Sequence, residues 1–258
     1  HTGGAVFGVH LVKIPVQTPL PEARERFAEK PAIARTIAEI GQKTNGYGLI
    51  ANGGRPLEQT TIAPVIDVAH DVFGSLVDEA VYRQADLLLI GWQGDFNVSR
   101  IYNSSVQHII AHAKADVAVF KDRGLERTDA ILVPWGGGPH AQLGLEYAVR
   151  IAEATGATIH LLRLVRPGAD SDLERENVKK AVGQIVGDYR RVHYHVREAE
   201  DFMESLQWFL DNGGYDLVII GASHEWRIRN FLFGSIPDVV ADYADCSVLM
   251  VRRYLPER

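Results

Sequence analysis

The sequence predicts an α/β protein made of two repeated doubly wound domains. Each is expected to be an open parallel five-stranded sheet in the order 3-2-1-4-5, with helices on both faces. Short apolar runs typical of buried parallel strands alternate with stretches of helical periodicity. The run Ala85–Ile90 before Gly91 also resembles the run Tyr215–Ile220 before Gly221. A length of 258 residues accommodates two such domains.

The same offset, held without gaps, aligns further identical residues in the two halves. The aligned pairs are Ala69 with Ala199, Asp71 with Asp201, Ser75 with Ser205, Leu76 with Leu206, Asp86 with Asp216, Ser105 with Ser235 and Ala111 with Ala241. Such a register is not expected by chance, and it indicates an internal repeat. We therefore predict domains at residues 1–124 and 129–258, joined near Gly124–Thr128.

The second copy has a complete set of alternating elements. Its expected strands are Ile131–Trp135, Thr158–Val165, Val192–Val196, Leu217–Ile220 and Ser247–Arg252. Its expected helices are Leu143–Ala154, Ser171–Tyr189, Phe202–Leu210 and Ile236–Tyr243. Asp170 or Ser171 is a suitable N-cap for the second helix, and Gly213 and Gly214 are expected to end the third.

The first copy lacks the first strand and helix. Its residues Ala5–Ile14 correspond to the second strand of the other copy, and the match resumes at Ile62. Several prolines in residues 15–61 indicate a broken helix and a loop. Because the absent strand would be central, its neighbours would keep unpaired backbone groups that cost about 1–3 kcal/mol each. We expect the sheet to be completed, either by residues outside this sequence or by another segment.

Composition narrows the class of protein. The net charge of −6 argues against nucleic acid as a partner. The single cysteine excludes an internal disulfide and fits a reducing compartment. No apolar run approaches the roughly 18 residues that span a bilayer, so we expect a cytoplasmic location, either soluble or on the cytosolic face of the inner membrane. The chain begins without Met, and a longer parent chain with a membrane region stays open.

The strongest candidate site is the loop after the fourth strand of the second copy. Gly221, Ser223 and His224 follow that strand, and after nine further residues Gly234–Ser235 opens a helix. Glycine allows close backbone approach, and a helix N-terminus attracts phosphate. Further candidates near the loop are Arg227 and Arg229, which add positive charge, and the turn of Gly136, Gly137 and Gly138 at the same sheet edge. The alternative is that these glycines serve tight turns alone.

The run from Gly221 to Asp238 resembles the universal stress protein family. Nucleotide-binding members of that family carry Gly-x₂-Gly-x₉-Gly-Ser/Thr after the fourth strand, and an Asp after the first strand that contacts the nucleotide. The resemblance covers nearly the whole chain as a tandem pair. A narrower similarity is to universal stress domains fused behind amino-acid permeases. The sequence segments that carry it are Leu132–His140, Gly221–Trp226 and Leu232–Asp238.

The resemblance assigns roles residue by residue. In the second copy, Gly221, Gly234 and Ser235 match the phosphate motif, His224 replaces its second glycine, Gly136 replaces the Asp after Pro134 and Trp135, and Val165 lies where members line the adenine pocket. In the first copy, Gly91 and Gly94 match, Ser104 replaces the third glycine, and Ser105 follows it. The second copy is the better candidate because its serine, helix and basic loop remain.

The resemblance implies a non-enzymatic sensor of the stress response that binds ATP or AMP, with Mg²⁺ accompanying the nucleotide. The expected partners are a pseudo-dimer of the two domains, a homodimer, and a membrane transporter in the same parent chain. The alternative is a degenerate scaffold or dimerisation module that binds no nucleotide. A slow ATP hydrolase would need a placed base and a metal ligand, and the sequence identifies neither, so we name no catalytic residue.

The histidine pairs do not predict a metal site. His108 and His112 share a face of an expected helix, but two ligands are too few and the His-Glu-x-x-His pattern is absent. His193 and His195 lie on one side of an expected strand without an acidic or sulfur neighbour, so we expect them at the surface. Cys246 is expected to be a small buried apolar residue.

Overall fold

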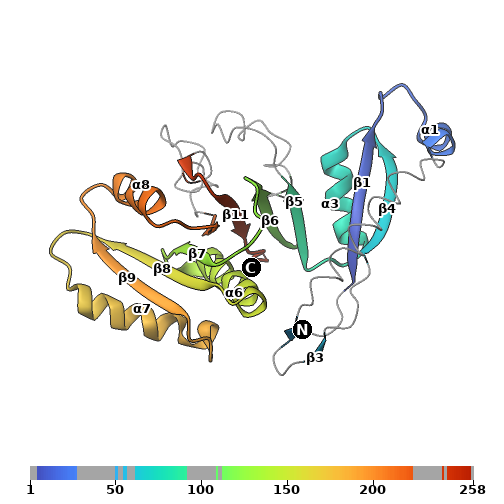
Figure 1. The fold of residues 1–258 in the computed structure, drawn as a ribbon. Helices are drawn as coiled ribbons and strands as arrows, with labels where there is room; N and C mark the ends of the chain where they lie inside the picture. Colours follow the sequence, from blue (N-terminus) through green and yellow to red (C-terminus); the bar gives the residue numbers. More distant parts are fainter. Residues whose placement is uncertain are drawn as a thin grey trace. The chain divides into compact units, whose positions relative to one another are not determined.

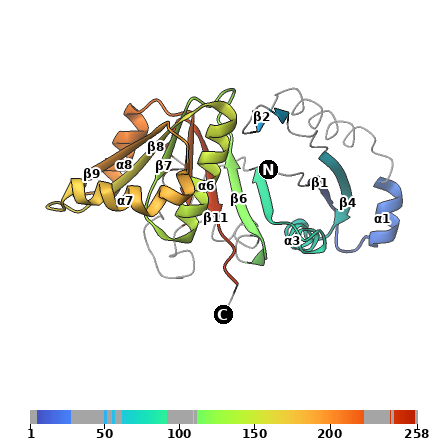
Figure 2. The same cartoon turned by 90° about the horizontal axis from the view of Figure 1, so that it is seen from below.

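The computed structural model describes residues 5–27, 50–51, 55–56, 62–91, 109, 112–222, 240 and 243–256. The chain divides into two compact units, His1–Arg83 and Gln84–Arg258 (Figures 1 and 2). Both are mixed α/β, as the sequence predicts. Among the helices in these ranges, none is long and apolar enough to span a bilayer.

The second unit is built on a seven-stranded sheet in the order β5-β6-β11-β10-β7-β8-β9. The strands are β5 (Leu87–Gly91), β6 (Asp116–Lys121), β7 (Ala130–Pro134), β8 (Thr158–Val165), β9 (Val192–Glu198), β10 (Leu217–Gly221) and β11 (Ser247–Arg252). From β11 to β9 the order is the predicted doubly wound one, with the first strand of the copy, β7, in the centre. Those strands are all parallel, which confirms the predicted fold class.

Three described helices cover this sheet: α6 (Gly138–Thr155), α7 (Ser171–Val186) and α8 (Phe202–Asn212). Apolar side chains of β7 and β8 pack with those of α6 and α7 in one core. Helix α8 covers the other face, on the opposite side of the sheet from α7 (Figure 1). Asp170 and Asp201 cap α7 and α8 by accepting two backbone N–H bonds each, as expected for Asp at a helix start.

The ends of two helices differ from the sequence prediction. Helix α6 begins at Gly138 rather than Leu143, because Pro139 suits the first helical turn. Helix α7 ends at Val186 rather than Tyr189, because Gly187 takes a positive φ of 56°. Of the helix predicted at Ile236–Tyr243, the structure describes Val240 and Tyr243 alone.

The first unit holds a two-stranded parallel sheet of β1 (Val6–Lys13) and β4 (Ile62–Ala69). Its other elements are α1 (Leu20–Phe27), α3 (Val72–Tyr82) and the short antiparallel pair β2 (Ile50–Ala51) and β3 (Arg55–Pro56). Ile14, Ala23 and Val68 form its small core. The guanidinium of Arg24 donates two bonds to the Asp67 carboxylate, at 2.8 and 2.9 Å.

The first copy of the repeat is therefore divided into two strand pairs. By the predicted order, β1 and β4 are its second and third strands, and β5 and β6 are its fourth and fifth. In the ranges that the structure describes, no strand pairs with the other edge of β1 or of β5. Leu89 of β5 is 62% exposed, whereas its repeat counterpart Ile219 in β10 is fully buried. No described segment takes the place of the missing strand, so completion of the sheet, by residues outside this sequence or by another segment, stays a prediction.

Strands β6 and β11, the last strands of the two copies, pair antiparallel over Val117–Lys121 and Val248–Arg252. This pairing joins the fourth and fifth strands of the first copy to the complete sheet of the second. It also reverses the strand direction, so the carboxyl ends of β5 and β6 lie at the opposite sheet edge from those of β10 and β7. The predicted domain boundary between residues 124 and 129 stays a prediction.

Candidate functional site

The carboxyl ends of β7 and β10 are the point where the two halves of a doubly wound sheet diverge. The ladder between these strands comprises Leu217 with Ile131 and Val218 with Leu132. Strand β7 continues to Pro134 and β10 continues to Gly221, and each keeps its other neighbour, β8 or β11, to its end. Ligands of open α/β sheets bind in the crevice at such a switch point.

The turn from β7 into α6 exposes three glycines at this edge. Gly137 and Gly138 have φ of 76° and 78°, a left-handed conformation that side-chain-bearing residues rarely adopt. Gly137 is the N-cap and supplies no side-chain bond, and the first turn of α6 holds no acidic residue. No side-chain cap therefore competes for the first N–H groups of an 18-residue helix, at the positive end of its dipole.

Gly136 differs from its two neighbours. Its φ is not positive, and a Cβ added there would meet no atom within 4 Å. A larger side chain at residue 136 would therefore fit without strain, facing open space beside the start of α6.

Gly221 allows close packing between β10 and α6. A Cβ at this residue would lie 2.5 Å from the carbonyl carbon of His140 and 2.6 Å from the nitrogen of Ala141. No backbone can move aside by that much without shifting the helix, so the close approach requires glycine. The first turn of α6 is thereby placed directly against the end of β10.

His140, which the sequence analysis did not single out, fixes this turn from the other side. Its Nδ1 accepts the backbone N–H of Arg253 at 3.0 Å. The Arg253 guanidinium lies 2.5 Å from the carboxylate of Glu146, which is also on α6. These bonds tie the start of α6 to the segment after β11. The only sequence signal for His140 is its place in the Gly-Gly-Gly-Pro-His turn.

The structure brings part of the predicted site together. Pro134 ends β7 and is buried, Gly136–Gly138 and Gly221 surround the start of α6, and Val165 is buried at the end of the neighbouring strand β8. Gly91 ends β5 at the opposite sheet edge. The remaining predicted residues lie outside the described ranges: Ser223, His224, Arg227, Arg229, Gly234 and Ser235 of the second copy, and Gly94, Ser104 and Ser105 of the first.

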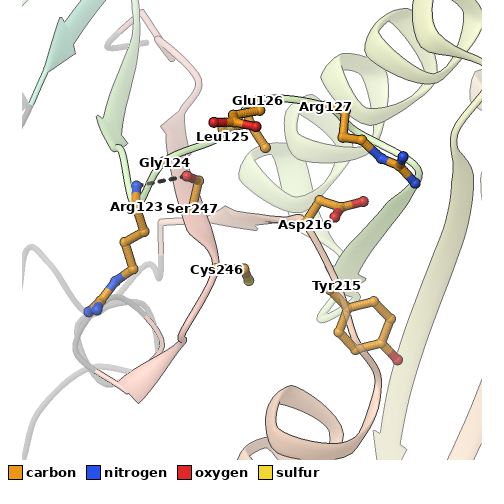
Figure 3. Close-up of a pocket in the computed structure, with 9 residues that line it drawn as sticks. All are labelled: Arg123, Gly124, Leu125, Glu126, Arg127, Tyr215, Asp216, Cys246 and Ser247. Atoms are coloured by element: carbon orange, nitrogen blue, oxygen red, sulfur yellow. Dashed lines mark hydrogen bonds between the residues drawn. The ribbon is translucent and has the colours of Figure 1, made fainter.

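A pocket of about 390 Å³ lies at the amino ends of β10 and β11, away from this edge (Figure 3). Asp216 accepts the backbone N–H groups of Asp129 and Ala130 at 2.7 and 2.9 Å. Ser247 Oγ accepts the backbone N–H of Arg123 at 2.9 Å. The polar groups of the pocket thus hold the loop between β6 and β7. The Asp216 carboxylate therefore has a structural role, because it binds the backbone at the start of β7.

Cys246 also lines this pocket and is partly buried. Burial raises the pKa of its thiol to about 11. Nearby Asp216 acts in the same direction, because its negative charge disfavours the thiolate. The thiol is therefore protonated at neutral pH and a poor nucleophile.

A cluster of three histidines lies on the face of β8 and β9 that α8 covers. His160 of β8 is the register partner of His193 in β9, and His195 follows on the same face. His160 Nδ1 lies 3.1 Å from His195 Nε2. Burial, followed by repulsion from His195 and His193, lowers the pKa of His160 to about 4. The pKa of His195 is also lowered, chiefly by burial.

His193 is exposed, as the sequence predicts, but His195 is partly buried. The sequence alone does not connect His160 with this pair, because the register between two strands cannot be read from either strand alone. A signal was nevertheless present, since His160 also alternates with buried apolar residues along its strand.

Comparison with known proteins finds a family match in the second half of the chain. Residues 128–252 match the model of the Universal stress protein family. A universal stress protein from Archaeoglobus fulgidus DSM 4304 has a similar structure, with a TM-score of 0.60 and 16% identity over 98% of this chain and 88% of the other. A functionally unknown protein from Pseudomonas aeruginosa PAO1 has a TM-score of 0.54 and 14% identity, over 97% and 83% of the two chains. No curated protein matches the sequence.

Proposed function

Since residues 128–252 form a universal stress protein domain, we propose that the chain is a non-enzymatic regulatory module that binds an adenine nucleotide, ATP or AMP. The binding site is the carboxyl edge of β7 and β10. The observation that carries this proposal is the start of α6. Its N–H groups follow two left-handed glycines, have no side-chain cap, and lie where β7 and β10 diverge.

The chemistry of this edge favours a phosphate-bearing ligand. The N-terminus of a helix offers N–H donors and a partial positive charge to an anion. In the proposed complex the phosphates also contact Gly234–Ser235. Arg227 and Arg229 add positive charge there, and Mg²⁺ accompanies a triphosphate. Val165 of β8 borders the adenine. These assignments follow the family motif that the sequence carries.

Gly136 limits the affinity in this proposal. Nucleotide-binding members of the family carry an Asp at this position of the motif, and that carboxylate contacts the nucleotide. The open space beside Gly136 leaves this contact unmade. A charged hydrogen bond contributes about 1.5–3 kcal/mol, so its loss predicts weaker binding than in members that retain the Asp.

Thermal unfolding with ATP, AMP and Mg²⁺ tests the proposal. A ligand at 100 times its dissociation constant stabilises the folded state by about 2.7 kcal/mol. The expected result is a rise in the unfolding temperature that Gly234→Val or Ser235→Ala abolishes. Ser105→Ala, at the equivalent position of the first copy, is the matched control and should retain the rise. No rise with either nucleotide would contradict the proposal.

A second candidate function is a scaffold without nucleotide binding. The antiparallel pairing of β6 with β11 favours it, because this pairing joins parts of both copies in one sheet irrespective of any ligand. In this case the two copies act as a pseudo-dimer for assembly, and nucleotides leave the unfolding temperature unchanged. For either function, the proposed target of regulation is a membrane transporter in the same parent chain. This target is proposed because the sequence of Leu132–His140 resembles that of permease-fused domains.

A further inference from the structure

The three histidines on the outer strands of the second unit lie apart from the crevice at β7 and β10. We propose that His160, His193 and His195 bind one divalent transition-metal ion of the zinc class. One ligand atom from each ring lies within 4.8 Å of those of the other two. Neither the nucleotide site nor the repeat accounts for this convergence.

The backbone fixes the three positions. His160 and His193 are partners in the parallel ladder between β8 and β9, and His195 is two residues further along β9. Side chains two residues apart on a strand point to the same face. All three imidazoles therefore leave one face of the sheet, with the ladder holding their Cα atoms in place.

The distances suit a metal centre. Two nitrogens bound tetrahedrally to Zn²⁺ at about 2.0–2.1 Å lie about 3.3 Å apart. His160 Nδ1 and His195 Nε2 are 3.1 Å apart, and their rings are stacked with an 8° interplanar angle. The third ligand, His193, is exposed, so its side chain is free to rotate and bring a ring nitrogen to the ion.

The surroundings hold two of the rings and leave the third open to water. The ring of Tyr215 packs edge-on against His160, and that of Phe209 packs edge-on against His195. These contacts restrict the two inner imidazoles before any metal arrives. The exposed side at His193 leaves a fourth position for water, the arrangement of a three-histidine zinc centre.

The ligand set also decides the class of ion. Neutral imidazole suits zinc, copper, nickel and iron, whereas magnesium and calcium prefer oxygen ligands.

When the ion binds, the hydrogen between His160 Nδ1 and His195 Nε2 must move to the other nitrogen of its own ring. This tautomer change frees both facing nitrogens without releasing a proton to solvent.

Titration calorimetry with ZnCl₂ on the full chain, without a histidine tag and in metal-free buffer, tests the site. The expected result is one Zn²⁺ per chain. ZnCl₂ should also shift the ring ¹⁵N signals of His160, His193 and His195 in NMR spectra. MgCl₂ at the same concentration should produce neither effect.

Two variants locate the bound ion. His193→Ala removes an exposed ligand and should leave folding intact while weakening Zn²⁺ binding at least about tenfold. His10→Ala removes an exposed histidine of β1 and should leave the Zn²⁺ affinity unchanged. Metal-free unfolding curves establish that both variants fold. The proposal is overturned if the wild type takes up no Zn²⁺, if His193→Ala binds as tightly as the wild type, or if His10→Ala loses as much affinity as His193→Ala.

Discussion

The backbone of Gly221 lies so close to that of His140 that an added Cβ would be 2.5 Å from the His140 carbonyl carbon. This contact places the N-terminus of α6 against the end of β10. His140 in turn accepts a bond from the backbone of Arg253 after β11. The geometry of the proposed nucleotide site thus depends on packing between backbone segments that are distant in the sequence.

Replacing Gly221 by Ala should destabilise the protein. The added methyl group overlaps the first turn of α6, and overpacking of this kind costs about 1–3 kcal/mol. The free energy of unfolding in urea measures the effect. Gly91→Ala is the matched control, because Gly91 ends the equivalent strand and its added Cβ would meet nothing within 4 Å. Equal effects of the two substitutions would contradict the packing argument.

Introducing Asp at residue 136 should strengthen nucleotide binding. Gly136 has neither a positive φ nor a neighbour that an added Cβ would strike, so the variant should fold normally. One new charged hydrogen bond is expected to lower the dissociation constant for AMP about tenfold or more. Titration calorimetry measures the change. Gly136→Asn controls for shape without charge, and unchanged affinity in Gly136→Asp would show that the nucleotide does not contact this residue.

Removing the Asp216 carboxylate should destabilise the second unit. Asp216→Ala leaves the N–H groups of Asp129 and Ala130 without their acceptor, and bonds to a charged group contribute about 1.5–3 kcal/mol. Urea unfolding should therefore occur at clearly lower concentration. Asp188→Ala is the control, because a surface substitution should change stability by less than about 0.5 kcal/mol. Unchanged stability of Asp216→Ala in urea would contradict a structural role for this carboxylate.

Alkylation of Cys246 should be slow and strongly dependent on pH. Its pKa of about 11, against an ordinary 9.0, leaves about a hundredfold less reactive thiolate at pH 8. The rate with iodoacetamide should keep rising about tenfold per pH unit from pH 8 to pH 10. Because the folded-state pKa is raised, the thiol favours the folded state below pH 9, and this contribution is lost as the pH rises towards 11. A rate that levels off near pH 9 would show an ordinary, accessible thiol.

Local patterns were sufficient to predict the architecture of the second copy. The apolar run Ile131–Val133 predicts a buried strand, and all three side chains are buried. Strand order followed from the alternation of strands and helices, because crossover connections restrict the topologies that a chain can adopt. The end of α7 was less predictable. Tyr189 fits the helical spacing, but its hydroxyl instead donates to the carbonyl of Ala152 on α6.

The candidate sites were less predictable because they depend on contacts between elements. The sequence indicates Gly221 as a point of close approach, but not that the approaching group is the backbone of His140. The pattern within β9 predicts surface positions for His193 and His195, because nothing within that strand shows that His160 of β8 is aligned with them. Register and helix docking are tertiary properties, whereas glycine patterns and periodicity report on local structure alone.

A nucleotide bound at the start of α6 would change the surroundings of the first N–H groups of that helix. NMR can follow the backbone amide signals of Gly137, Gly138 and His140 as ATP is added. We expect these signals to shift and saturate together, because their N–H groups lie at the phosphate-binding end of the helix. Unchanged signals here at saturating ATP, or shifts confined to the pocket that Arg123 and Ser247 line, would contradict it.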